Sequence, residues 1–202
     1  MGEHSLQFAA LVGSRICHDL ISPIGAINNG MELIAMSGQS TSPEMALISE
    51  SIDAANARIR FFRIAYGPAS DAQQLSASEI ASLLTDITKG SRLSLTYDLP
   101  DNLPRSEAQL IFLAFQCLEQ ALPYGGDISL SPQNGRWRFI ARSDRLSFDP
   151  NLWSMLENGK DVASDTMSTP AHVQFLLLPL HAAAKGRRIE VTQGDGTALL
   201  VV

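Results

Sequence analysis

The feature that most constrains this chain is a regular apolar spacing at its N-terminal end. Over residues 3–37, apolar or small residues recur at alternating steps of four and three: Leu6, Ala10, Gly13, Cys17, Leu20, Ile24, Ile27, Met31 and Ile34. This 3.5-residue period is typical of a helix that packs a narrow apolar seam against another helix. The spacing therefore predicts one long helix over 3–37.

A second helix is expected directly after the first. Ser37 and Gly38 form a C-terminal glycine signal, and residues 41–44 (Thr-Ser-Pro-Glu) supply a cap, a first-turn proline and an early acid. Residues 44–66 then repeat the seam with Met45, Ile48, Ile52, Ala55, Ile59, Phe62 and Tyr66. Together, the two segments predict a helical hairpin.

One hairpin can bury such narrow seams only in part, whereas two hairpins together enclose a four-helix core. We therefore expect a homodimer built on a four-helix bundle. The alternative is that the seam packs on the chain's own second half.

The periodicity changes after Gly67-Pro68-Ala69-Ser70, which breaks the second helix and begins a polar segment. This break predicts a hairpin domain over 1–68, a linker over 69–74 and a second domain over 75–202. In the second domain, Ser76 and Glu79 have capping-box spacing. The expected helices lie at 76–89, 104–122 and 171–185. An irregular stretch precedes the last of these helices. The expected strands lie at 92–97, 127–130, 136–140, 188–191 and 198–201. The fold class is α+β, with helices behind a mostly antiparallel sheet.

The composition excludes several classes of protein. Of 202 residues, 45% are apolar and 18% charged, as in soluble globular proteins. A net charge of −6 disfavours binding to nucleic acid. No apolar run approaches the roughly 18 residues of a membrane span, and no signal peptide is recognisable, so we expect a cytoplasmic protein without membrane contact. Cys17 and Cys117 are expected to be reduced thiols.

His18 is the candidate nucleophile, because it follows Cys17 of the seam and so lies at the reachable edge of the bundle. Asp19 could hold the imidazole tautomer, and Arg15, one turn earlier, could offset the charge of anionic oxygens. The residues on the same helix face would receive a partner: Leu11, Ser14, Ile21, Ser22, Gly25 and Asn29. The alternative is a solvent-exposed histidine without a function.

The segment 18–27 resembles the phosphoacceptor box of two-component histidine kinases, in which a histidine is followed by an acid, an apolar residue and, five positions on, a proline. Those kinases carry the box on the first helix of a dimeric hairpin. Pro23 lacks an N–H, frees the carbonyl of Asp19 and is expected to bend the helix.

The second half resembles the ATPase domain of the same kinases, but its nucleotide contacts are missing. Gln116 and Gln120 stand where the kinases have magnesium-binding asparagines, and residues 143–146 (Ser-Asp-Arg-Leu) lack the glycines of the adenine motif. No glycine-rich lid precedes the segment 173–181. We therefore expect a degenerate ATPase-like α/β sandwich that neither binds ATP nor phosphorylates itself.

Residues 15–33, with support from 121–126, resemble the ChpT family of histidine phosphotransferases from alphaproteobacteria, and the likeness covers nearly the whole chain. The resemblance implies a dimer that accepts a phosphoryl group on His18 from the receiver domain of a hybrid histidine kinase. The same resemblance implies that the dimer then passes the group to receiver aspartates of response regulators of the cell cycle. Mg²⁺ would come with the receiver domain, so no intrinsic cofactor or metal site is expected. Two alternatives remain: a divergent ATP-dependent histidine kinase, and a dimeric adaptor that binds receiver domains without being phosphorylated.

Overall fold

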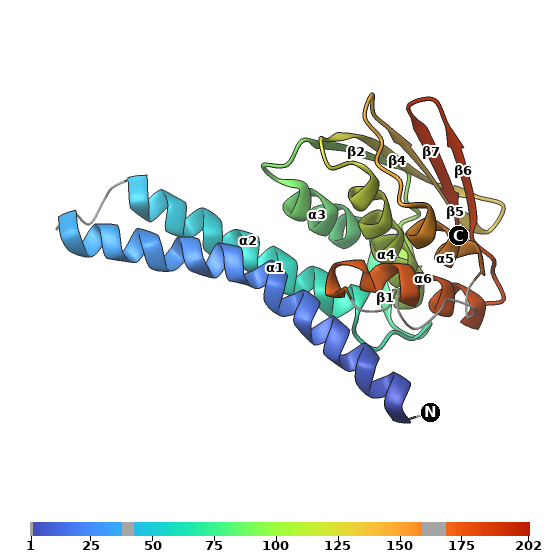
Figure 1. Cartoon of the computed structure of the whole chain (residues 1–202), viewed down its shortest axis with the longest axis horizontal. Coiled ribbons are helices and arrows are strands. Elements are labelled where there is room, and N and C mark those ends of the chain that lie inside the picture. The colour runs from blue at the N-terminus through green and yellow to red at the C-terminus, as the bar shows by residue number, and fades with distance from the viewer. Residues whose placement is uncertain (1, 38–42, 159–168) are drawn as a thin grey trace.

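The N-terminal part of the chain is a helical hairpin in the computed structural model, which describes residues 2–37, 43–158 and 169–202. Helices α1 (Gly2–Ser37) and α2 (Pro43–Ala65) project from the rest of the molecule as a rod (Figure 1). Both predicted helices are confirmed. The expected stop at Gly38 and the cap at Thr41 and Ser42 lie outside the described residues.

Two small residues shape the hairpin. Gly30 is buried, and a Cβ placed on it would lie 2.6 Å from Cγ1 of Ile48, so α1 and α2 approach closely at this turn. Pro23 is buried inside α1, and the axis of α1 changes direction partway along its length (Figure 1). The bend agrees with the expected effect of a proline within a helix.

The second half contains a five-stranded sheet with the strand order β2-β4-β5-β7-β6. Its strands are β2 (Leu93–Tyr97), β4 (Gly126–Gln133), β5 (Arg136–Arg142), β6 (Glu190–Gly194) and β7 (Thr197–Val201). β2 pairs with β4 in parallel, and the other neighbours are antiparallel. Asn134 and Gly135 both have positive φ, 52° and 74°, as the two-residue turn between β4 and β5 requires. The α+β class and the mostly antiparallel sheet are confirmed.

Three of the helices behind the sheet, α3 (Ala77–Thr88), α4 (Arg105–Ala121) and α6 (Val173–Ala184), correspond to the predicted ones (Figure 1). The capping box of α3 is present: Ser76 Oγ accepts a hydrogen bond from Glu79 N, and the Glu79 carboxylate accepts one from Ser76 N. Helix α4 is buried along most of its length and forms the centre of the core.

Four short elements were not predicted: β1 (Gln74–Ser76), which pairs with β3 (Asn102–Pro104), helix α5 (Pro150–Asn158) and the 3₁₀ turn η3 (Pro170–His172). The expectation of irregular structure before α6 is therefore wrong at α5. Asp149 Oδ1 accepts a hydrogen bond from Asn151 N, and Pro150 occupies the first turn, so the start signal was present in the sequence. The buried residues Leu152, Trp153, Met155 and Leu156 hold α5 on the core.

The base of the hairpin packs on the second half. Phe61 stacks on Phe112 of α4, with ring centroids 4.7 Å apart, and Phe62 and Ala65 belong to the same apolar core. The side-chain amide of Gln109 also donates hydrogen bonds to backbone carbonyls near the end of α2. The end of the second seam is thus covered by the chain itself, while the rest of the rod extends beyond the second half (Figure 1). The division at 69–74 stays a prediction.

None of the described helices is both long and apolar enough to cross a membrane.

Candidate functional site

His18 exposes its ring near the middle of α1. Its side chain is 79% exposed, and Nδ1 lies 3.0 Å from Asp19 Oδ1. A carboxylate can only accept hydrogen bonds, so this contact assigns the proton to Nδ1. The lone pair of the neutral ring is then on Nε2, which is available to an approaching electrophile.

The carboxylate of Asp19 lies between the histidine and two arginines. Asp19 Oδ1 accepts from His18, whereas Oδ2 accepts from Arg15 Nε over 2.9 Å. Nη1 of Arg58, which belongs to α2, lies 3.7 Å from the same oxygen. The Asp19 side chain is only 8% exposed, so these contacts determine how its carboxylate is oriented.

Arg15 makes a second contact, with the other half of the chain. Its Nη1 donates a hydrogen bond of 2.6 Å to the carbonyl oxygen of Ala171 in η3, and its side chain is 13% exposed. The guanidinium is thus directed at Asp19 and Ala171. Contact between Arg15 and a phosphoryl group stays a prediction.

The residues expected to receive a partner lie along α1 on both sides of His18. Ser14, Ile21, Ser22 and Asn29 are exposed, and Leu11 and Gly25 are partly buried. A Cβ placed on Gly25 would meet nothing within 4 Å. This surface is therefore open to a second molecule.

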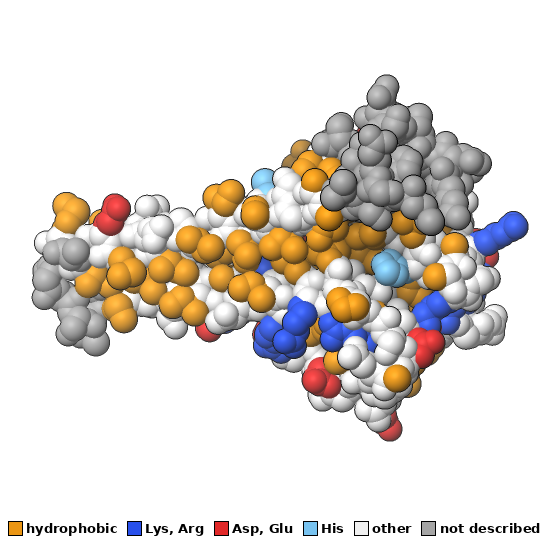
Figure 2. Space-filling view, turned by 90° about the horizontal axis from the view of Figure 1, so that it is seen from below, with side chains coloured by type: hydrophobic (Ala, Val, Ile, Leu, Met, Phe, Trp, Pro, Cys, Tyr) orange, Lys and Arg blue, Asp and Glu red, His pale blue; other side chains and the backbone are white. Residues whose placement is uncertain are grey.

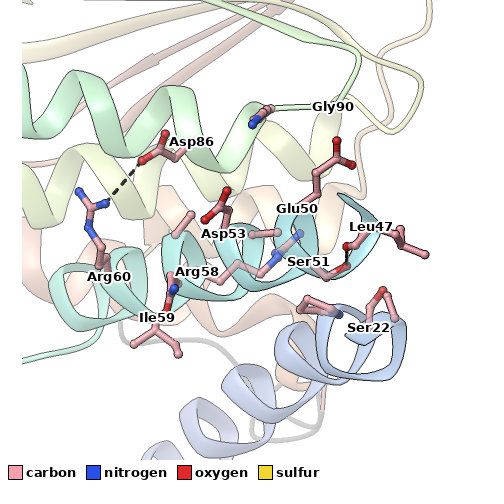
Figure 3. Close-up of a pocket in the computed structure, with 16 residues that line it drawn as sticks. Ser22, Leu47, Glu50, Ser51, Asp53, Arg58, Ile59, Arg60, Asp86 and Gly90 are labelled. Atoms are coloured by element: carbon pink, nitrogen blue, oxygen red, sulfur yellow. Dashed lines mark hydrogen bonds and ion pairs between the residues drawn. The ribbon is translucent and has the colours of Figure 1, made fainter. Parts of the chain in front are cut away.

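A groove of about 990 Å³ adjoins this surface, between α1, α2 and α3. Ser22 lines its α1 side, Arg58 and Arg60 line its α2 side, and Asp86 lies opposite on α3 (Figure 3). Nη1 of Arg60 is 3.6 Å from Asp86 Oδ2, so an ion pair spans the groove from α2 to α3. Arg58 lines the groove and also lies 3.7 Å from Asp19, the partner of His18. The groove is therefore close to the histidine.

Other polar groups near the site were not predicted. The Tyr66 hydroxyl donates a hydrogen bond to Oε1 of Gln116, which is 4% exposed. Burial raises the pKa of Tyr66 to about 12, although Arg15 acts in the opposite direction. Gln120, the second residue at an expected magnesium position, is exposed. Among the described residues, no group of three or more His, Cys, Asp or Glu side chains could hold a metal ion.

Arg58 could have been found from the sequence, because the antiparallel hairpin places the C-terminal half of α2 opposite the turns of α1 around His18. The partners contributed by the second half, above all the Ala171 carbonyl, had no signal in the sequence.

His172, His181 and the two cysteines lie outside the contacts around His18 described above. The His172 ring lies edge-on to Phe175, with centroids 6.3 Å apart, and burial lowers the pKa values of His172 and His181. Cys17 and Cys117 are free thiols, as expected.

Comparison with known proteins gives three results. Residues 77–197 match the family described as histidine phosphotransferase C-terminal domain. Protein phosphotransferase ChpT of Brucella abortus (strain 2308) is 36% identical over 128 residues, which are 62% of this chain and 61% of that protein. The chain therefore matches about three fifths of the length of this curated relative. A solved structure described as a bacterial phosphotransferase superposes with a TM-score of 0.81 and 29% identity, covering 97% of this chain and 95% of that one.

Proposed function

Because the chain belongs to the histidine phosphotransferase family, we propose that it carries a phosphoryl group on His18 between two receiver domains. The donor is the receiver domain of a hybrid histidine kinase, and the acceptors are receiver domains of response regulators of the cell cycle. The relay takes place in the cytoplasm. One observation carries the proposal: an exposed imidazole is held through its Nδ1 by an adjacent carboxylate, which leaves Nε2 as the nitrogen with the lone pair.

The transfer is a pair of in-line displacements. The Nε2 lone pair forms a bond to the phosphorus of the donor's aspartyl phosphate, and the P–O bond breaks to leave the donor's carboxylate. The carboxylate of the second receiver then attacks the phosphohistidine, and the P–N bond breaks to restore the neutral ring. Asp19 stabilises the positive charge that the ring gains when it is phosphorylated. Mg²⁺ is supplied by the receiver domain, and this chain contributes no cofactor.

Arg58 is the better placed of the two arginines to offset phosphoryl charge. The Arg58 side chain is 43% exposed and lies 3.7 Å from Asp19. The Arg15 side chain is 13% exposed, and its guanidinium donates hydrogen bonds to Asp19 and to the Ala171 carbonyl. We therefore assign charge compensation to Arg58. The receiver docks over Leu11, Ser14, Ile21, Ser22, Gly25 and Asn29, and reaches the groove beside them.

The functional unit is a homodimer whose hairpins form a four-helix bundle. Large apolar side chains are exposed along the rod (Figure 2), and members of both predicted seams are among them: Ile24 (49% exposed), Met31 (60%), Ile52 (44%) and Ile59 (50%). A contiguous apolar surface of this kind favours association with another molecule. A second copy of the same hairpin presents a matching seam.

The test is a phosphotransfer profile against purified receiver domains carrying a labelled aspartyl phosphate. We expect labelled protein and onward transfer for the wild type and for His181→Gln, and none for His18→Gln. If receiver-dependent function survives in His18→Ala, the chain acts as the unphosphorylated adaptor instead.

The ATP-dependent kinase is less well supported, because Oε1 of Gln116 is engaged by the Tyr66 hydroxyl and the expected glycine motifs are missing from the sequence. We expect no label on His18 from ATP alone, and no ADP binding by calorimetry below the millimolar range. Incorporation from ATP without any added kinase would restore that alternative.

A further inference from the structure

Arg15 joins the turn of α1 that carries His18 to the second half of the chain. Its Nε donates to Asp19 Oδ2 over 2.9 Å, and its Nη1 donates to the Ala171 carbonyl over 2.6 Å. Because a guanidinium is planar and rigid, two hydrogen bonds in different directions fix its plane. The fixed plane in turn sets where the Asp19 carboxylate must lie.

The Ala171 carbonyl is itself held in place from the second half. It also accepts a hydrogen bond of 3.0 Å from Nε2 of Gln174, which is completely buried in α6. Pro170 fixes the backbone just before it, and His172 N donates to Thr169 O across the same turn. The anchor of Arg15 is therefore part of the packed structure.

The orientation and tautomer of the His18 ring depend on the Asp19 carboxylate, because the His18 side chain is 79% exposed and has few other protein contacts. Its hydrogen bond to Asp19 Oδ1 selects the Nδ1–H tautomer. Arg58 cannot replace Arg15 in this role, since its Nη1 lies 3.7 Å from Asp19 Oδ2 and its side chain is 43% exposed.

We propose that Arg15 is a positioning residue through which η3 and α6 hold the Asp19 carboxylate, and thereby keep Nε2 of His18 as the nitrogen that is phosphorylated. This inference rests on the proposed function and deepens it, because it gives the second half of the chain a role in the transfer. In this role the ATPase-like half fixes the position of Asp19, the hydrogen-bond partner of the phosphoacceptor His18.

The first readout is the tautomer of His18, measured on the full-length protein by long-range ¹H–¹⁵N NMR of the histidine ring nitrogens. We expect mainly Nδ1–H in the wild type. In Arg15→Gln the ratio of Nδ1–H to Nε2–H should fall by about tenfold, as expected when the support of one charge-assisted hydrogen bond is lost. Arg63→Gln is the matched control, because it removes an exposed guanidinium from α2 and should keep the wild-type ratio.

The second readout is the site of phosphorylation by phosphoramidate, a small donor that needs no receiver domain. The ring nitrogen forms the P–N bond as the P–N bond of the donor breaks and ammonia leaves. ³¹P NMR distinguishes the two phosphohistidine isomers. We expect Nε2-phosphohistidine in the wild type and in Arg63→Gln, and a slower reaction that yields both isomers in Arg15→Gln.

A folded Arg15→Gln protein with the wild-type tautomer ratio and wild-type isomer would overturn the proposal. If Arg15→Gln does not fold, Arg15→Lys decides by the same two readouts, because an ammonium keeps the charge but cannot hold both partners in one plane. The tautomer ratio does not require phosphotransfer. The proposed function fails separately, if no receiver domain transfers its phosphoryl group to the wild-type protein.

Discussion

The Tyr66 hydroxyl donates a hydrogen bond of 3.0 Å to Gln116 Oε1 and so ties the end of the helical hairpin to the central helix α4. The Tyr66 ring also stacks on Phe62, with centroids 5.5 Å apart. Hairpin and second half are thus joined by a polar contact as well as by the apolar core, close to the arginine that supports Asp19.

Tyr66→Phe should lower the free energy of unfolding by about 1–3 kcal/mol, because it leaves the buried acceptor of Gln116 without its partner while the ring stacking is retained. Urea denaturation measures the loss. The control is Tyr97→Phe on the edge strand β2, where the side chain is 41% exposed and the change should stay within about 0.5 kcal/mol. Equal losses in both variants would contradict a specific contribution from the Tyr66 hydroxyl.

Glu107 of α4 is a second polar junction. Its carboxylate accepts two hydrogen bonds from Arg187, at 2.8 and 3.0 Å, and one from Trp137 Nε1, and Lys185 lies 3.1 Å away. Desolvation alone would raise the pKa of Glu107, but these donors outweigh it, so the pKa lies below its usual 4.5.

Glu107→Gln should therefore destabilise the protein by about 2–3 kcal/mol at pH 7. Because the folded-state pKa is lowered, this stabilisation is present above the unfolded-state pKa and is lost as the pH falls through the folded value. The difference between wild type and variant should shrink below about pH 4.5. Denaturation at several pH values tests this, with Glu190→Gln, whose side chain is 66% exposed, as the control. A difference independent of pH would contradict the assignment.

The sequence predicted those parts of the fold that have strong local signals. The seam repeated along α1 and α2 and the capping box at Ser76 each depend on residues within a few turns of each other. Helix α5 was missed because its nine residues are too short for periodicity to stand out, although Asp149 and Pro150 marked its start. The strands β1 and β3 have three residues each, and their pairing is set by the surrounding tertiary structure.

The candidate site likewise has a part that local sequence predicts and a part that only the tertiary structure brings together. His18 and Asp19 are adjacent and Arg15 is one turn away, so helix geometry alone brings them together. The contact between Arg15 and Ala171 joins residues 156 positions apart and uses a backbone carbonyl, for which no residue type is diagnostic. The groove likewise depends on how α3 lies against α2.

Ile59→Asp should convert a dimer into monomers or cause aggregation. Ile59 is 50% exposed in the single chain and lies on the second seam, so the substitution would place an unpaired charge in the proposed bundle core. Light scattering at tens of micromolar measures the mass. Leu180→Asp is the control, because Leu180 is 37% exposed but lies on α6 and belongs to neither seam, and this variant should remain dimeric. A monomeric wild type would refute the bundle.

Ser22→Trp tests the docking surface. Ser22 is exposed one turn after His18 and lines the groove between α1 and α2, so an indole there would occupy the space that an incoming receiver domain needs. The receiver must bring its aspartate close to the imidazole for in-line transfer, and bulk at this position should hold it away. The receiver concentration that gives half-maximal rate should rise by at least about tenfold, because docking is weakened while His18 and Asp19 are unchanged. Ser22→Ala, which changes the side chain without adding bulk, should behave as the wild type. Rapid-quench kinetics over a range of receiver concentrations separates the half-maximal concentration from the maximal rate. Wild-type saturation in Ser22→Trp would place the partner on another face of α1.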